Sequence, residues 1–255
     1  MEISSKNQTI LVFSDPHQEI HRVEYLLKNE SYDTAVCLGD WFDSSDYNDR
    51  EHWEKTCGFL KKWIFKSNFI TCIGNHDIHY LFDNKTTLCS GYYLKKNKLI
   101  VQRFGSFLPA IREKFLWYLW IDDFLCSHAG VNTYHFSPNL QVNKQGITNW
   151  LEEQIKFAEL PLINGGYHWL YGAGAARGGR QNIGGITWQD FNSEFEPIEG
   201  LKQIVGHTNH RKIVAKEPYI GSGIYDCNNF DVDCFLNQYL LIKNNKLEIK
   251  NFRDL

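Results

Sequence analysis

Three short apolar segments in the first third of the chain, at 9–13, 34–38 and 69–73, each end in a cluster of polar residues. The stretches between them, 21–29 and 52–66, carry apolar residues at the spacing of one helix face. Apolar runs that alternate with helices are typical of βαβ units, whose strands are buried on both faces of a largely parallel sheet. The sequence therefore predicts an α/β fold for this part of the chain.

The second half has a different pattern of elements. It predicts two strands around a tight turn at 115–121 and 124–126, a helix at 147–157, a short strand at 203–205, and a hairpin with an Asn-Asn turn at 238–252. We expect a second, more antiparallel sheet from these segments. Because no linker rich in Pro, Gly or Ser divides the chain, residues 1–255 are expected to form a single domain.

Net charge, the length of apolar runs and the cysteine pattern indicate where the protein is located and which classes of partner it binds. With 27 Lys and Arg against 30 Asp and Glu, the net charge of -3 argues against binding nucleic acid through bulk positive charge. The N-terminus lacks the apolar core of a signal peptide, and the longest apolar run, 115–121, is too short to span a membrane, so no membrane partner is expected. The 7 cysteines form no Cys-x-x-Cys pair. We therefore expect reduced, structural thiols and a cytoplasmic location.

Five polar clusters, each directly after a predicted strand, carry the residue types that catalysis or metal binding needs. They are Asp15-x-His17, Asp40 with Asp43, Asn75-His76-Asp77, His128 and His207. Ligands of α/β sheets bind at the carboxyl ends of the strands, so these side chains are expected to converge. Oxygen and nitrogen donors without thiolates suit ions such as Mn, Fe or Zn. The number of donors exceeds what one tetrahedral site needs, which indicates a pair of metals.

The order of these motifs is Asp-x-His, Gly-Asp-x-x-Asp, Gly-Asn-His-Asp, His and Gly-His-Thr, and it resembles the calcineurin-like metallophosphoesterase superfamily. The motifs span residues 15–207, and their combination is far more specific than any single one. Many members of the superfamily have a second His where this chain has Asn209. In lacking it, the chain is similar to the Ser/Thr protein phosphatase-like branch and its bacterial and phage relatives. The resemblance implies a four-layer αββα sandwich of two mixed sheets flanked by helices.

The resemblance also implies a set of ligands for two divalent metal ions. Mn is the first choice, with Fe, Zn, Ni or Mg as alternatives. Asp40 would bridge both metals with its two carboxylate oxygens. Asp15 and His17 would complete the first site, and the second site would be completed by Asn75, His128 and His207.

Two further residues would act in catalysis. His76 would be the general acid that protonates the leaving group. Asp43 would orient His76 and favour its protonated form, although an Asp at this position could instead cap a helix. Trp41, which lies between Asp40 and Asp43, is placed to line the site.

The arginine that contacts phosphate in this branch is the point at which the chain departs from the pattern. The branch usually has Asp-Arg-Gly at the end of the second motif. Here Asp43 is followed by two serines, so the usual arginine is missing. Arg177 and Arg180 are the candidate replacements, because a guanidinium binds two phosphate oxygens at once and the neighbouring glycines allow close approach. The branch carries an Arg before its last motif, which makes Arg177 the first choice.

These implied roles predict hydrolysis of phosphate monoesters by a hydroxide that bridges the metals. The substrate would be a phosphoprotein or a small phosphoester or nucleotide. A nucleotide or cyclic-nucleotide phosphodiesterase, or a dinucleoside polyphosphate hydrolase, is the alternative, because the same metal pair serves both reactions. A non-catalytic scaffold is a third hypothesis, which the presence of His76 disfavours.

Overall fold

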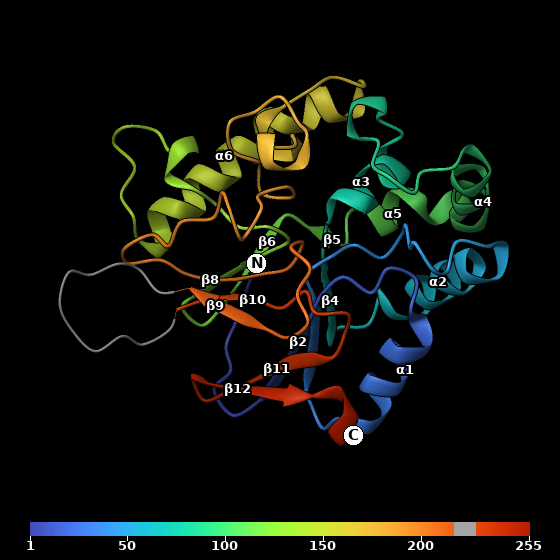
Figure 1. The fold of residues 1–255 in the computed structure, drawn as a ribbon, viewed down its shortest axis with the longest axis horizontal. Helices are drawn as coiled ribbons and strands as arrows, with labels where there is room; N and C mark the ends of the chain where they lie inside the picture. The colour runs from blue at the N-terminus through green and yellow to red at the C-terminus, as the bar shows by residue number, and fades with distance from the viewer. Residues whose placement is uncertain (217–227) are drawn as a thin grey trace.

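The computed structural model describes residues 1–216 and 228–255. Within these residues, two six-stranded sheets pack together with helices around them (Figure 1), which confirms the αββα sandwich. The helices are α1 (Ile20–Asn29), α2 (Arg50–Trp63), α3 (Asn75–Phe82), α4 (Leu94–Phe104), α5 (Leu108–Arg112) and α6 (Lys144–Ile163). The strands are β1 (Glu2–Ile3), β2 (Thr9–Phe13), β3 (Thr34–Cys37), β4 (Phe69–Cys72), β5 (Phe115–Leu116), β6 (Tyr118–Ile121), β7 (Phe124–Ser127), β8 (Lys202–Val205), β9 (Val214–Lys216), β10 (Asn229–Asp231), β11 (Gln238–Lys243) and β12 (Lys246–Asn251).

The first sheet has the strand order β12-β11-β2-β3-β4-β5. Strands β2 to β5 are parallel, as expected for βαβ units in which α1 and α2 connect successive strands. The hairpin β11–β12 turns at Asn244 and Asn245, whose φ angles of 49° and 60° suit the predicted Asn-Asn turn. The hairpin pairs antiparallel with β2, so the end of the chain completes the sheet that its beginning starts.

The second sheet, in the order β1-β6-β7-β8-β10-β9, is less antiparallel than the sequence pattern predicts. Its β1–β6, β7–β8 and β8–β10 pairs are parallel, whereas β6–β7 and β10–β9 are antiparallel. The segment 115–121 is also not one strand. Its first part, β5, pairs with β4 in the first sheet, and β6 pairs with β7 in the second. Both parts lie in apolar surroundings, so the apolar pattern alone cannot reveal that the chain passes from one sheet to the other within this segment.

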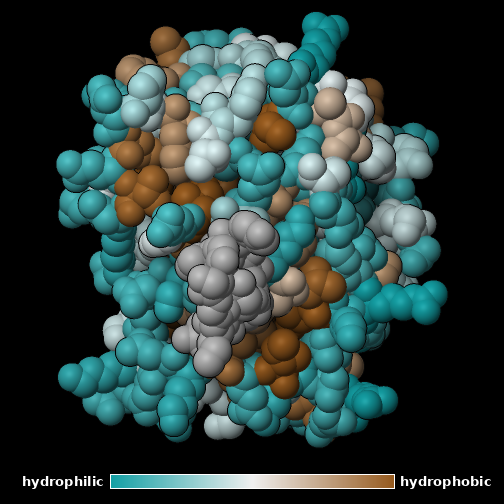
Figure 2. Space-filling view, turned by 60° about the vertical axis from the view of Figure 1, so that its left-hand side comes forward, coloured by the Kyte–Doolittle hydropathy of each residue, from teal (hydrophilic) through white to brown (hydrophobic). Residues whose placement is uncertain are grey.

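Alternate residues of β2 show why its apolar run is continuous. Ile10 and Val12 belong to the core between the two sheets, together with Leu119 of β6. Leu11 and Phe13 belong to the larger core that includes apolar residues of α1 and α2. Both faces of the strand are therefore buried, as in parallel sheets generally. The surface in Figure 2 is mostly hydrophilic, with its apolar side chains in separate small patches.

Four helices differ from the sequence prediction, and one of them, α5, was not predicted. Helix α3 begins at Asn75, so the Asn-His-Asp cluster forms its first turn, and α4 was not predicted at all. Helix α6 is longer than the predicted 147–157 and contains Pro161. None of the described helices is long and apolar enough to cross a membrane. The six cysteines among the described residues are buried and form no disulfide, and Cys227 lies outside these residues.

Candidate metal centre

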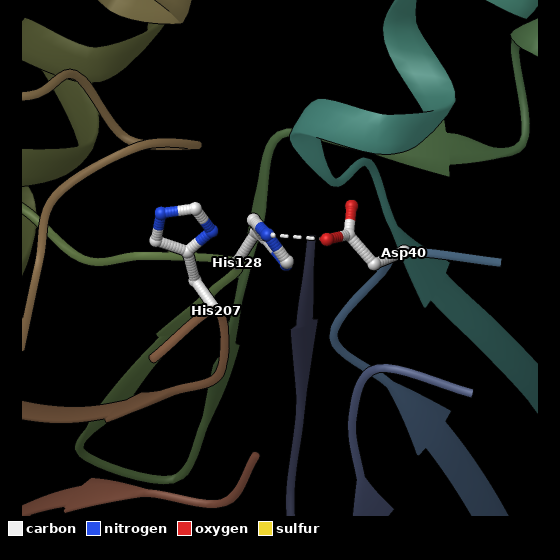
Figure 3. Close-up of side chains that lie close together, drawn as sticks. All are labelled: Asp40, His128 and His207. Carbon is white, nitrogen blue, oxygen red and sulfur yellow. Dashed lines mark ion pairs between the residues drawn. The ribbon is translucent and has the colours of Figure 1, made fainter. Parts of the chain in front are cut away.

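The motif residues come together where strands of both sheets end. Asp15 follows β2, Asp40 follows β3, Asn75 follows β4, His128 follows β7 and His207 follows β8. Two groups of donor atoms, each within 4.8 Å of one another, result. Figure 3 shows the second group, with the His128 ring between the Asp40 carboxylate and the His207 ring. The first group is Asp15, His17 and Asp40, and the second is Asp40, His128 and His207.

A single oxygen of Asp40 is common to both groups. Asp40 Oδ2 lies 3.8 Å from His17 Nε2 and 3.4 Å from His128 Nε2. The other oxygen, Oδ1, accepts a hydrogen bond of 2.8 Å from the backbone N–H of His76. The expectation that Asp40 bridges two metals with both carboxylate oxygens stays a prediction, because Oδ1 accepts one hydrogen bond but keeps a second lone pair. Only Oδ2 faces both donor groups.

Backbone carbonyls determine which nitrogen of two histidines carries hydrogen. Nδ1 of His17 lies 3.1 Å from the carbonyl oxygen of Phe42, and Nδ1 of His128 lies 2.9 Å from that of Leu38. A carbonyl only accepts, so each Nδ1–H donates, and each Nε2 is the nitrogen that faces Asp40. Metal-binding histidines are commonly oriented in this way by a partner on the other nitrogen.

The amide of Asn75 tests whether these donors suit a metal ion. Its Oδ1 lies 2.9 Å from His128 Nε2, in a position that is also 2.9 Å from His207 Nδ1 and 3.3 Å from Asp40 Oδ2. An amide oxygen among acceptor atoms has no donor to bind. Two arrangements remove this mismatch: the amide turns so that its NH₂ group donates to these atoms, or a cation binds between them. Asp15 Oδ1 is likewise buried without a hydrogen-bond partner among the described residues. The carboxylate, amide and imidazole donors fit divalent ions.

Neighbouring carboxylates favour a positive charge on His128. Burial acts to lower the pKa of His128, but the charges of Asp40 and Asp15 outweigh it and raise the pKa to about 9. A cation bound to Nε2 would replace the proton that these carboxylates hold there.

The loops that present the donors have an unusual backbone conformation. Positive φ angles occur at Asp15 (53°), His17 (41°), Asp40 (59°), Asp43 (64°) and His207 (74°). Such angles are uncommon for residues other than glycine, and strain of this kind clusters at binding and catalytic sites. Among the described residues, five of the thirteen non-glycine residues with positive φ are candidate site residues.

His76 and Asp43 form a pair beside the donor groups. His76 Nδ1 lies 3.0 Å from Asp43 Oδ2, and the imidazole is 16% exposed. Burial acts to lower the pKa of His76, but the charge of Asp40 and the hydrogen bond to Asp43 raise it above its usual value. Asp43 is not a helix cap, because Asp49 caps α2 by accepting from the N–H of His52.

Trp41 of the second motif and Asp77 of the third stabilise the fold and do not face the donor groups. Trp41 does not line the site, because its side chain is fully buried and its Nε1–H donates to Thr71. The carboxylate of Asp77 accepts 2.9 Å hydrogen bonds from the backbone N–H groups of Asp40, Trp41 and Gly74. Asp77 therefore ties the loop after β3 to the start of α3. Its sequence signal is an acidic residue in the first helical turn.

A cavity of about 590 Å³ opens over the donors. Arg177 lines it and is held by an ion pair of 2.9 Å with Asp190 and a hydrogen bond of 3.1 Å to Thr208 Oγ1. Arg180 is not among the residues that line this cavity and lies instead on the wall of a neighbouring one. Three aromatic side chains that no sequence motif marks also line the cavity: Tyr167, Tyr171 and Trp188.

Comparison with known proteins agrees with this architecture. A cold-active protein-tyrosine phosphatase of a psychrophilic Shewanella species has a TM-score of 0.63 at 14% identity, over 100% of this chain and 81% of that one. A protein serine/threonine phosphatase from Saccharomyces cerevisiae has a TM-score of 0.55 at 13% identity, over 98% and 83%. These likenesses show the fold alone, and no curated protein sequence matches significantly. Residues 8–236 match the calcineurin-like phosphoesterase family, and the chain therefore belongs to it.

Proposed function

We propose that this chain is a single-domain phosphatase that hydrolyses phosphate monoesters with two divalent metal ions. The observation that carries the proposal is the shared Asp40 Oδ2, which faces both donor groups while the His76–Asp43 pair lies beside them. When bound, two such ions would activate the attacking water and neutralise charge on the phosphoryl oxygens. Mn is our first choice because the donors are oxygens and imidazole nitrogens.

The proposal divides the donors between two ions. Asp40 belongs to both sites through Oδ2. Asp15 and His17 would complete the first site. The second site would be completed by Asn75, His128 and His207.

The remaining residues of the site would handle the substrate. His76 lines the cavity, and because its Nδ1–H is held by Asp43, its Nε2 is the nitrogen that can give a proton to the leaving oxygen. The Arg177 guanidinium would bind phosphate oxygens, since its position is maintained by Asp190 and Thr208. Arg180, on the neighbouring cavity, would contact only the larger leaving groups.

The charge of the site favours monoesters over diesters. A monoester dianion offers three free oxygens, one for each of two cations and one for Arg177, whereas a diester offers two and carries less charge. The alternative, hydrolysis of nucleotide diesters or dinucleoside polyphosphates, is favoured by the three aromatic side chains in the cavity wall, because a base can stack on such rings.

Turnover of three substrates with added Mn distinguishes these activities. We expect p-nitrophenyl phosphate to have a kcat/KM roughly 10-fold or more above those of bis-p-nitrophenyl phosphate and diadenosine tetraphosphate, a difference of about 1.4 kcal/mol or more in transition-state binding. Faster turnover of either of the latter would favour the alternative activity. If no ester is hydrolysed with Mn, Mg, Zn, Fe or Ni, the chain is a non-catalytic scaffold.

Metal analysis tests the shared ligand independently of activity. Asp40→Asn should reduce the Mn stoichiometry measured by elemental analysis, because the amide lacks the negative charge that both sites use. Asp123→Asn makes the same chemical change at an exposed position and is the matched control. An unchanged stoichiometry in Asp40→Asn would contradict the bridging role.

A further inference from the structure

A buried lysine lies behind the His76–Asp43 pair. The side chain of Lys96, on α4, is completely buried, and its Nζ lies 2.5 Å from Asp43 Oδ1. Nζ also donates a 2.8 Å hydrogen bond to the carbonyl oxygen of Gly91. A lysine is rarely buried without a partner, because removing its charge from water is costly. The Lys96–Asp43 contact is therefore the interaction that makes this position of the lysine possible.

The two oxygens of Asp43 have different partners. Oδ1 accepts from Lys96 Nζ and from the hydroxyl of Tyr80, each at 2.5 Å. Oδ2 accepts from His76 Nδ1 at 3.0 Å. Because the Asp43 side chain is fully buried, water cannot replace a lost partner. Rotation of the carboxylate would break both contacts of Oδ1, so these contacts keep Oδ2 directed at His76.

The same lysine also holds part of the cavity wall. Gly91 has a φ of +86°, and a Cβ on it would meet Asp43 Cβ at 3.0 Å, so the loop packs directly against Asp43. Its neighbour Ser90 lines the cavity over the donors. By binding both the Gly91 carbonyl and the Asp43 carboxylate, Lys96 fixes the loop and the His76 partner relative to each other.

We propose that Lys96 is a positioning residue that locks the Asp43 carboxylate and thereby aims His76 at the leaving oxygen. The inference rests on the proposed function for the role of His76. Lys96 belongs to neither donor group and is not among the residues that line the cavity, so the main effect of losing it should appear in the steps that need His76. Loss of Lys96 should therefore matter for poor leaving groups, which need a proton, and not for good ones.

The test compares Lys96→Met with wild type on phenyl phosphate and 2,4-dinitrophenyl phosphate. We expect kcat for phenyl phosphate to fall roughly 10- to 100-fold, the usual effect of a misplaced catalytic group. The kcat for the dinitrophenyl ester, the KM values and the Mn content should stay close to wild type. In the His76→Ala background, Lys96→Met should have no further effect on kcat, because the residue it positions is gone.

Asn97→Ala is the matched control. Asn97 is the next residue of α4, is also buried, and contacts Asp83 instead of Asp43, so both substrates should be hydrolysed as by wild type. Equal losses of Lys96→Met on both esters, or a further loss in the His76→Ala background, would overturn the positioning role. If Lys96→Met does not fold, Lys96→Gln, which keeps a neutral hydrogen-bond donor, replaces it. It is compared with wild type and in the His76→Ala background, and the same outcomes are expected. Inactivity of the wild type on both esters would refute the proposed function instead.

Discussion

The packing of the metal centre can be tested by adding one methyl group at Gly74. The backbone of Gly74, with φ of −99° and ψ of 169°, is open to any residue, so only space limits the substitution. A Cβ there would lie 2.1 Å from Asp40 Oδ1 and 2.5 Å from Asp40 N, whereas ordinary contacts begin at 3.4 Å. Gly74→Ala must therefore displace the Asp40 carboxylate by more than 1 Å.

The free energy of unfolding should fall for two reasons. Overpacking a core typically costs about 1–3 kcal/mol. Displacing Asp40 Oδ1 also breaks its hydrogen bond with the His76 N–H, and a bond to a charged group contributes about 1.5–3 kcal/mol. We expect a total loss of roughly 3–6 kcal/mol, which lowers the melting temperature by about 6 °C or more in a domain of this size. The Mn stoichiometry should fall as well, because Asp40 Oδ2 moves with the carboxylate.

Gly58→Ala is the control for this substitution. Gly58 lies within α2, and a Cβ there meets no atom within 4 Å. Because alanine is the better helix former, Gly58→Ala should stabilise the protein by about 0.5–1 kcal/mol. Thermal and urea unfolding, followed by circular dichroism, measure both variants, and elemental analysis measures Mn. If Gly74→Ala melts at the wild-type temperature and binds as much Mn, the result would contradict the close contact between Gly74 and Asp40.

Three further predictions concern charge at the site. Asp43→Asn removes a negative charge that helps to raise the pKa of His76. Since the general acid must be protonated, the loss of kcat at alkaline pH should begin at lower pH than in wild type, and an unmoved profile would contradict the pair. Arg177→Ala should raise the KM for p-nitrophenyl phosphate roughly 10-fold, for a lost charged hydrogen bond of about 1.5–3 kcal/mol, and Arg180→Ala should raise it less; equal effects would contradict the placement of the two arginines. Because the pKa of His128 is about 9, it is protonated at pH 7.5 and Mn binding should release a proton, which calorimetry in buffers of different ionisation enthalpy detects; binding without proton release would contradict the protonated state.

The donor clusters could be predicted because each lies in a short segment directly after a strand. Asp15, Asp40 and Asn75 follow parallel strands of one sheet, and such strands end at the same edge. His128 and His207 follow neighbouring parallel strands of the other sheet. Their convergence with the first three depended on the two sheets packing face to face, which the resemblance implied and the strand patterns alone did not.

Other features of the site could not be predicted because they depend on distant contacts. Which oxygen of Asp40 faces both donor groups depends on the N–H of His76, 36 residues away. Lys96 is one of many lysines in the sequence, and nothing nearby in the chain marks it as the partner of Asp43. Its helix, α4, was itself not predicted, so its burial could not be foreseen.

The local pattern of apolar and polar residues was enough to establish the βαβ units, the residue types at the strand ends and the chemistry that those donors suit. Such properties depend on neighbours in the chain, because periodicity of side chains decides which face of an element is buried. Tertiary structure alone divided the segment 115–121 between two sheets, separated Arg177 from Arg180, and placed Lys96 behind Asp43. These outcomes depend on which surfaces meet across the fold, and a buried charge or a shared oxygen is defined by partners that are remote in sequence.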